Sequence, residues 1–355
     1  MSKIQAFTAL GARLKEYFSI GEKAPIYPRM EAALERASLH NAWFDRDNCL
    51  FALQHWAECL TQEQLQRWLS AYSFEGKTPK RVALILAASD VYKRQALILA
   101  GNIPMVGFHD LLCVILSGNK AVVKLSSHDT VLLPFIFQEL TEIAPEMEEF
   151  ISFTQERLTD FEAVIATGSN NTARYFEYYF ARKPHIIRRN RNSVAILTGK
   201  ETPKELYQLG EDIFRYFGLG CRSVSKLFVP RDYDFAPFFE AIYPYHSLLD
   251  HQKYINNYDY NKAVYLMSLC PLLENGFLLL KEDEKYASPI ATLFYERYDD
   301  LTILSQRLEK ERELLQCVVG SKEIPEAIPF GQTQVPSLTD YADGVDTLAF
   351  LNSIN

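Results

Sequence analysis

One cysteine in this chain lies in a sequence context suited to a nucleophile. Cys221 follows Gly218 and Gly220 and precedes the apolar run of residues 224–229. Glycine has no Cβ, so the backbone can turn sharply here and a substrate carbonyl can come close to the sulfur and the neighbouring amides. A thiolate near such amides has a lowered pKa, as an acyl-accepting cysteine requires. The alternative is that Cys221 is one of six small buried hydrophobic residues, so a second motif is needed.

Three further blocks precede this cysteine. They are Gly-Asn-Ile-Pro at residues 101–104, Gly-Asn-Lys-Ala-Val-Val-Lys-Leu-Ser-Ser at residues 118–127, and Ala-Thr-Gly-Ser at residues 166–169. Together with Lys226, five residues after the cysteine, they resemble the aldehyde dehydrogenase superfamily. That superfamily has an Asn-x-Pro turn, a Val-Val-Lys-Pro-Ser strand, a Phe-Thr-Gly-Ser loop and a Gly-Gln-x-Cys-x-x-x-x-Arg segment in the same order. Each block alone is weak evidence, but the ordered set is specific.

The resemblance implies catalytic roles for two residues. Cys221 accepts the acyl group, and the tetrahedral oxyanion is stabilised by the side-chain amide of Asn102 and the backbone N–H of Cys221. Superfamily members that oxidise aldehydes also carry a glutamate between the Thr-Gly-Ser loop and the cysteine, where it activates the water that hydrolyses the acyl-cysteine. Residues 182–194 of this chain contain no carboxylate. Without that base, the acyl-cysteine hydrolyses slowly and can exchange with a thiol or accept hydride.

These properties suit an acyl-CoA reductase. Most of the chain is similar to the LuxC-type acyl-CoA reductases of bacterial luminescence, including the tail at residues 339–351. The resemblance implies reduction of an acyl-CoA, most simply a fatty acyl-CoA, or of an acyl-protein thioester to the aldehyde. It also implies a homodimer and an acyltransferase or synthetase partner. The alternatives are an aldehyde dehydrogenase that oxidises an aldehyde, and an acyl-binding or scaffold member that no longer reduces its substrate.

The resemblance also implies a nicotinamide cofactor. It assigns Lys124, Ser126 and Ser127 to the adenosine-ribose corner, and Gly168 with Ser169 to the pyrophosphate side, where a loop that opens a helix offers N–H groups to phosphate. Coenzyme A is expected only as part of the substrate, and no metal is expected.

The choice of cofactor depends on the residues after Lys124. Members that select NAD commonly have a glutamate just after the Lys-Pro-Ser run, whereas this chain has Ser127 and His128. A small neutral residue leaves room for a 2′-phosphate near Lys124, so we expect NADPH, with NADH as the alternative. The charge of Asp129 opposes this choice.

Three arginines in the segment without a carboxylate have two interpretations. Arg188, Arg189 and Arg191 either bind the phosphates of coenzyme A or of the cofactor, or form a solvated basic edge.

Composition excludes several classes of protein. The 355 residues carry a formal charge of −8 and no dense Lys/Arg tract, which argues against nucleic acid as the main partner. The six cysteines lack paired metal spacing and the N-terminus lacks a long apolar region, so we expect a reduced cytoplasmic protein. No apolar run approaches the roughly 20 residues that a membrane span requires.

The pattern of the chain predicts an α/β protein. Amphipathic helices at the N-terminus are followed by buried strands that alternate with helices, which favours a doubly wound parallel sheet. With the aldehyde dehydrogenase resemblance, we expect a helical N-terminal segment, a cofactor-binding domain, an α/β catalytic domain with the nucleophilic cysteine, and a tail that returns to the cofactor domain or an oligomer interface. Their predicted ranges are 1–78, 79–197, 198–328 and 329–355.

An internal repeat interrupts the pattern just before Asn102. The sequence Ala-Leu-Ile-Leu-Ala of residues 83–87 recurs at residues 96–100, with a polar segment between the copies. One hypothesis is that about thirteen residues here are an insertion or an error in the sequence. The alternative is a true strand-loop-strand in which two apolar strands match, and resequencing of the source DNA distinguishes the two.

Overall fold

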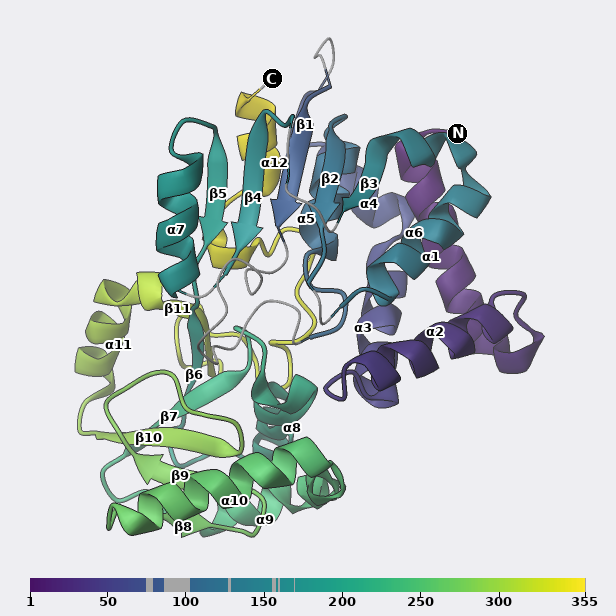
Figure 1. Cartoon of the computed structure of the whole chain (residues 1–355). Coiled ribbons are helices and arrows are strands. Elements are labelled where there is room, and N and C mark those ends of the chain that lie inside the picture. Colours follow the sequence, from purple (N-terminus) through teal and green to yellow (C-terminus); the bar gives the residue numbers. More distant parts are fainter. Residues whose placement is uncertain are drawn as a thin grey trace. The chain divides into compact units, whose positions relative to one another are not determined.

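The structure, a computed structural model, describes residues 1–74, 79–85, 103–126, 129–154, 158, 160–168 and 170–354. They form two compact units: the first unit comprises residues 1–190 and 337–355, and the second unit comprises residues 191–336. Each unit is built around one sheet of mostly parallel strands (Figure 1).

The first unit has a five-stranded sheet whose strands are all parallel. Their spatial order is β3 (Ile151–Thr154), β2 (Lys120–Lys124), β1 (Arg81–Ile85), β4 (Ala163–Thr167) and β5 (His185–Arg188). The chain thus moves from β1 outward through β2 to β3, and then returns to the other side of β1 for β4 and β5. Because parallel crossovers are right-handed, connections that run in opposite directions place their helices on opposite faces. This is the expected doubly wound arrangement.

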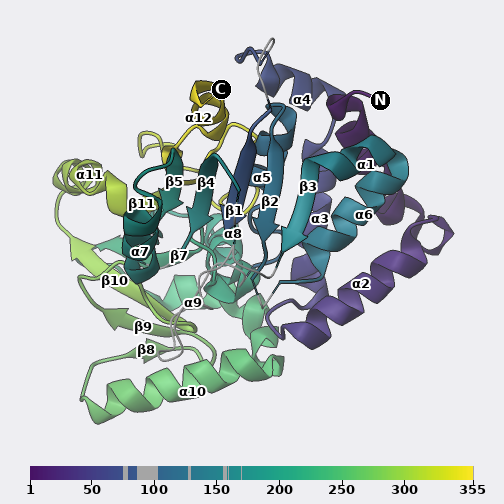
Figure 2. The same ribbon diagram turned by 45° about the horizontal axis from the view of Figure 1, so that its top comes forward.

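The helices of this sheet follow that rule. Helix α5 (Phe108–Leu116) packs against β1 and β2, and α7 (Asn170–Phe180) packs against β4 and β5. The C-terminal helix α12 (Thr347–Ser353) packs against α5 and lies on the other side of the sheet from α7 (Figure 2). Helix α6 (Leu132–Ile143) and a 3-10 segment (Pro145–Phe150) connect β2 to β3.

The N-terminal part of the first unit is helical, as expected. Its helices are α1 (Lys3–Ile20), α2 (Tyr27–His40), α3 (Arg46–Cys59) and α4 (Gln62–Leu69), with a 3-10 turn at Gly21–Lys23. Side-chain caps set three of the N-termini: Ser2 forms a capping box with Gln5 at α1, and Asp45 and Thr61 cap α3 and α4. Helix α1 packs against α3 and α6.

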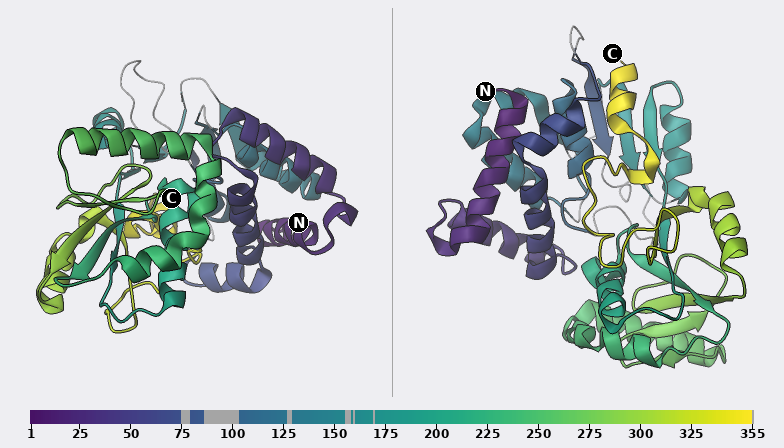
Figure 3. Two further views of the ribbon diagram at one scale, coloured as in Figure 1. Left: turned by 90° about the horizontal axis from the view of Figure 1, so that it is seen from below. Right: turned by 180° about the vertical axis from the view of Figure 1, so that it is seen from behind.

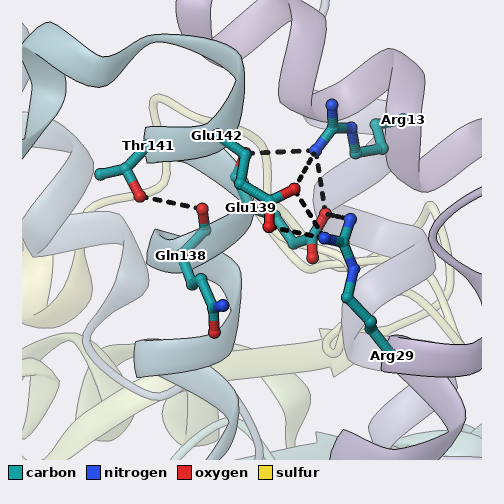
Figure 4. Close-up of polar contacts among 6 residues, drawn as sticks. All are labelled: Arg13, Arg29, Gln138, Glu139, Thr141 and Glu142. Atoms are coloured by element: carbon teal, nitrogen blue, oxygen red, sulfur yellow. Dashed lines mark hydrogen bonds and ion pairs between the residues drawn. The ribbon is translucent and has the colours of Figure 1, made fainter.

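An ion-pair network attaches α1 and α2 to α6 (Figure 4). The fully buried Glu139 accepts from Arg13 at 3.0 Å and from Arg29 at 2.9 Å, both at Oε2. Arg29 also pairs with Glu142, at 2.5 Å. Burial raises the pKa of Glu139, although the two arginines oppose this. A buried carboxylate is stable only when it is paired, so this network fixes the N-terminal helices on the sheet-connecting helix.

The second unit has a six-stranded sheet. Its spatial order is β11 (Leu315–Gly320), β6 (Asn192–Ile196), β7 (Val224–Pro230), β10 (Thr292–Tyr298), β9 (Leu279–Glu282) and β8 (Leu273–Glu274), and β8 alone is antiparallel to its neighbour. Its α-helices are α8 (Pro203–Phe214), α9 (Ala236–Ile242), α10 (Gln252–Met267) and α11 (Leu301–Lys310), and its 3-10 segments are Arg215–Gly218, Tyr243–Asp250 and Arg312–Leu314.

Two apolar layers enclose this second sheet. On one face, Leu209 of α8 and Phe238 of α9 are fully buried with Leu227 of β7. On the other face, Leu304 and Leu308 of α11 pack with Phe228 of β7. Neighbouring residues of a strand point to opposite faces, so β7 contributes to both layers. Figure 3 shows α10 along the outside of this unit.

Most predicted elements of the fold are confirmed. Five apolar runs predict strands, and the structure has β1, β2, β4, β6 and β7 there; the runs are residues 82–87, 121–125, 161–167, 193–198 and 225–230. The charged run of residues 301–315 predicts a single helix, and this prediction is wrong at its C-terminal end, because α11 ends at Lys310 and Leu315 begins the alternating strand β11. Strands β3 and β5 are four residues each, too short for a clear pattern. The repeat hypothesis concerns residues 88–100, which lie outside the described residues. No described helix is long and apolar enough to cross a membrane.

Candidate functional site

Cys221 lies in the turn between α8 and β7, and its side chain is exposed. All six cysteines lie among the described residues, and four of them, Cys49, Cys59, Cys113 and Cys317, are buried. Burial raises the pKa of Cys59 to about 11 and that of Cys113 well above its ordinary value. Cys270 is partly exposed. Cys221 is therefore not a packed core residue, and it is the most accessible thiol of the chain.

The backbone before Cys221 is strained. Tyr216, Phe217 and Gly218 have φ of 55°, 57° and 74°, the left-handed region that costs an ordinary L-residue about 1–2 kcal/mol. Both aromatic side chains are buried, and the Phe217 ring packs on His251 with its centroid 4.1 Å away. Tertiary packing therefore stabilises a left-handed backbone conformation that is unfavourable for an isolated segment, as is typical of turns at functional sites.

Two hydrogen bonds fix the peptide units on either side of the nucleophile candidate. The carbonyl of Cys221 accepts from the Ser193 hydroxyl of β6 at 2.9 Å. The carbonyl of Gly220 accepts from the Ser223 N–H at 2.9 Å. The turn therefore presents the thiol on a backbone that is held from both sides. Asn102, the other predicted catalytic residue, lies outside the described residues.

Lys226, which the resemblance aligns with the arginine of the cysteine segment, is a buried strand residue. Its Nζ lies 2.5 Å from Oε2 of Glu296 and donates to the carbonyl of Glu284 at 2.8 Å. Burial lowers the pKa of Lys226, and Glu296 opposes this. Its contacts join β7 to β10, so it stabilises the sheet that carries the cysteine turn.

Three of the five predicted cofactor residues are described. Lys124 is the last residue of β2, and Gly168 directly follows β4. Ser126 is buried, while Ser127 and Ser169 lie outside the described residues. In open parallel sheets, ligands bind at the carboxyl ends of strands where the strand order reverses, here between β1 and its neighbours β2 and β4.

The chemistry of these residues fits a dinucleotide in part. Lys124 is half-buried and has no ion-pair or hydrogen-bond partner among the described residues, so its charge is available to a phosphate or ribose. The N–H of Gly168 donates to the carbonyl of Arg188 at 3.3 Å. A phosphate contact on the pyrophosphate side therefore has to use other amides of the loop.

Asp129 was expected to repel a 2′-phosphate, but its environment weakens that objection. Its side chain is only 4% exposed, and neither carboxylate oxygen has a hydrogen-bond partner among the described residues. Burial raises its pKa to about 7. A large part of the Asp129 population is therefore uncharged near neutral pH.

The contacts of Arg188 fit neither a phosphate-binding role nor a place on a solvated basic edge. Arg188 is 3% exposed, and it donates to Asp110 of α5 from Nη2 at 2.6 Å and from Nε at 3.2 Å. It also donates to the Ala342 carbonyl at 2.6 Å and to the Thr347 hydroxyl at 2.9 Å. It is neither a solvated charge nor free for a phosphate. Sequence reasoning missed this pair because its members are 78 positions apart.

Arg188 also cannot act as a base. Burial lowers its pKa, but the charge of Asp110 outweighs this and the net shift is upward, so the guanidinium stays protonated. Arg189 pairs with Glu177 at the surface, and Arg191 donates to the Leu315 carbonyl at 3.3 Å.

Solved structures share this fold at low sequence identity. A variant of indole-3-acetaldehyde dehydrogenase from Pseudomonas syringae, in complex with NAD+ and IAA, is 13% identical with a TM-score of 0.58, over 92% of this chain and 74% of that chain. A variant of aldehyde dehydrogenase C from the same species, in complex with NAD+ and octanal, is 12% identical with a TM-score of 0.56, over 91% and 73%. An NADP dependent enzyme from E. coli is 13% identical with a TM-score of 0.55, over 92% and 80%. None of the curated proteins matches the chain in sequence.

A family model narrows the assignment. The model described as LuxC, acyl-CoA reductase, matches residues 93–238, which include every residue predicted to act in catalysis or cofactor binding. Over these residues the chain is similar to the LuxC-type acyl-CoA reductases. The solved structures show that the chain has the aldehyde dehydrogenase fold. Among the described residues, no cluster of three or more His, Cys, Asp or Glu side chains could hold a metal ion.

Proposed function

We propose that this protein reduces an acyl-CoA, most simply a fatty acyl-CoA, to the aldehyde with NADPH, through an acyl-cysteine on Cys221. The observation that supports this most is the exposed thiol of Cys221 on a strained turn within the segment that matches the LuxC family. The other described cysteines are buried, apart from the partly exposed Cys270.

The reaction begins at the sulfur. The thiolate of Cys221 attacks the thioester carbonyl carbon, and the Cys221 N–H and the Asn102 amide stabilise the oxyanion. Collapse of this species breaks the bond to the sulfur of coenzyme A, which leaves as a thiolate and takes up a proton. Lys124, Ser126 and Ser127 would hold a nicotinamide cofactor, which would supply the hydride for reduction of the acyl group to the aldehyde. The second collapse breaks the bond to Cys221 and regenerates its thiolate.

Two features support reduction over aldehyde oxidation. Residues 182–194 contain no carboxylate, and the buried arginine of this segment is engaged by Asp110 and stays protonated. Residues 182–194 thus offer no carboxylate to activate water against the acyl-cysteine, which favours reduction.

Lys124, Ser126 and Ser127 would hold the adenosine-ribose end of the cofactor, and the loop at Gly168 and Ser169 its pyrophosphate. NADPH is favoured because Lys124 has no partner among the described residues and the charge of Asp129 is suppressed by burial. We further propose a cytoplasmic homodimer supplied by an acyltransferase or synthetase.

The test is NADPH oxidation with a series of acyl-CoA chain lengths, with the aldehyde trapped as product. We expect turnover in the wild type, none in Cys221→Ala, and normal turnover in Cys270→Ala, the matched control at the other accessible cysteine. An acylated wild type that is not reduced would instead support the acyl-binding alternative. Faster turnover with NADH would overturn the cofactor assignment.

A further inference from the structure

The backbone N–H of Cys221 belongs to the peptide unit that it shares with Gly220. In a trans peptide, the N–H and C=O lie in one plane and point in opposite directions. The Gly220 carbonyl accepts from the Ser223 N–H at 2.9 Å, and no described peptide bond is cis. The direction of the Cys221 N–H is therefore set by the position of Ser223.

Ser223 is held by a segment from the end of the second unit. The side chain of Gln334 donates from Nε2 to the Ser223 hydroxyl at 3.3 Å, and both residues are buried. Beside it, Arg222 donates from Nε to the Thr333 carbonyl at 2.5 Å. The short segment 330–334 thus contacts both residues that follow Cys221.

Asp212 of α8 anchors this segment. Its fully buried carboxylate accepts from the Gly331 N–H at 2.6 Å, from the Thr333 N–H at 2.9 Å and from the Thr333 hydroxyl at 2.8 Å. Burial of a carboxylate is costly unless such donors satisfy it, so these bonds define the position of the segment. Gly331 has φ +81°, and a Cβ there would lie 3.1 Å from Cβ of Gln208 on the same helix. The segment therefore lies directly against α8 at Gly331.

We infer that Asp212 and Gln334 are positioning residues that aim the Cys221 N–H at the oxyanion. The connection runs from Asp212 through Thr333 and Gln334 to Ser223, and from Ser223 to the peptide unit of the nucleophile. The inference rests on the proposed role of Cys221 as the acyl acceptor. Loss of one oxyanion donor costs about 10²–10³ in rate, so a donor that is present but misaligned is expected to cost about tenfold.

Two reagents separate this role from the reactivity of the thiol itself. With p-nitrophenyl butyrate, the thiolate attacks the ester carbonyl, the bond to the nitrophenyl oxygen breaks, and nitrophenolate leaves, by way of an oxyanion. With iodoacetamide, the thiolate attacks the methylene carbon and iodide leaves, and no oxyanion forms. Neither reaction needs the cofactor. The burst of nitrophenolate therefore reports the oxyanion site, while alkylation reports only the thiolate and its access.

The test compares Gln334→Met and Asp212→Asn with the wild type, in the full chain with Cys270→Ala as background. Met keeps the volume of Gln334 without its donor, and Asn places an NH₂ donor against the N–H groups that Asp212 now accepts. We expect the butyrate burst to slow about tenfold in each variant and the alkylation rate to stay within about twofold of the wild type. Glu211→Gln is the control on the same helix, because Glu211 pairs with Arg215 outside this network. It is expected to change neither rate.

Parallel loss of both rates, or loss of neither, would overturn the inference. Ser223→Ala gives a second measurement. Because this change removes the hydroxyl that Gln334 contacts, adding Gln334→Met to Ser223→Ala should not slow the butyrate burst any further. Additive effects of these two substitutions would contradict the connection through Ser223. Failure of the proposed function gives a different result. A wild type that is acylated by the ester but does not reduce acyl-CoA would reject the reductase function. The ratio of the burst rate to the alkylation rate would still decide the role of Asp212 and Gln334.

Discussion

Replacement of Arg188 by methionine tests whether this residue is structural, as its contacts indicate. Its side chain is 4% exposed, and that of its partner Asp110 is 9% exposed. The change removes the two bonds to Asp110 and the bonds to the Ala342 carbonyl and the Thr347 hydroxyl. It leaves the Asp110 carboxylate buried, with only the Thr347 hydroxyl at 3.3 Å as a donor among these groups.

The expected loss of stability follows from the buried Asp110 carboxylate, which no longer has its ion-pair partner. Removal of one partner of a buried ion pair costs about 3–5 kcal/mol. At about 2–4 °C per kcal/mol for a domain of this size, Arg188→Met should lower the Tm by about 6–20 °C. Arg189→Met is the matched control, because Arg189 and its partner Glu177 are 56% and 40% exposed, and it should change the free energy of unfolding by no more than about 0.5 kcal/mol.

The assay is urea and thermal unfolding of both variants and of the double variant Arg188→Met with Asp110→Leu. The double variant contains no unpaired buried charge at position 110, so it should be more stable than Arg188→Met alone, with a coupling energy of about 1–3 kcal/mol. Equal stability losses in Arg188→Met and Arg189→Met, or strict additivity in the double variant, would refute the reasoning. Either result would return Arg188 to the set of residues available to phosphate.

Two further predictions concern charge and backbone strain. Burial raises the pKa of Asp129 to about 7, above the roughly 3.9 of an unfolded chain, so its contribution to stability is fully present below about pH 4 and is lost as the pH rises through 7. The wild-type free energy of unfolding should therefore fall between pH 4.5 and 7, and Asp129→Asn should make this fall less steep by up to about 1.4 kcal/mol per pH unit. Urea unfolding over this pH range measures the slope, and an unchanged slope would contradict the raised pKa of Asp129. Gly218→Ala should destabilise the protein by about 1–2 kcal/mol and slow the alkylation of Cys221 by iodoacetamide, because φ is +74° and the added Cβ would lie 3.2 Å from the Ile213 carbonyl oxygen. Wild-type alkylation in a destabilised Gly218→Ala would show that the turn need not keep this conformation.

The sequence by itself determined the type of fold and the candidate nucleophile. Apolar runs such as residues 121–125 have the length and the β-branched content of buried parallel strands, and helices between them require a doubly wound sheet. Glycines beside Cys221 indicated a turn, because a backbone without Cβ adopts tight turns at the lowest steric cost. These signals are local, so they can be read without knowing which residues meet in space.

Only the tertiary structure decided which polar groups are buried together. The sequence allowed Arg188 either a phosphate-binding role or a place on a solvated basic edge, and the structure instead pairs it with Asp110. Asp212 gave no signal in the sequence, because its partners Gly331 and Thr333 lie about 120 positions later in the chain. Left-handed φ at Tyr216 and Phe217 could not be expected either, because bulky residues avoid that region unless packing compensates. The energy of a buried charge or a strained turn depends on partners that folding brings together from distant parts of the chain, and no local pattern in the sequence encodes those partners.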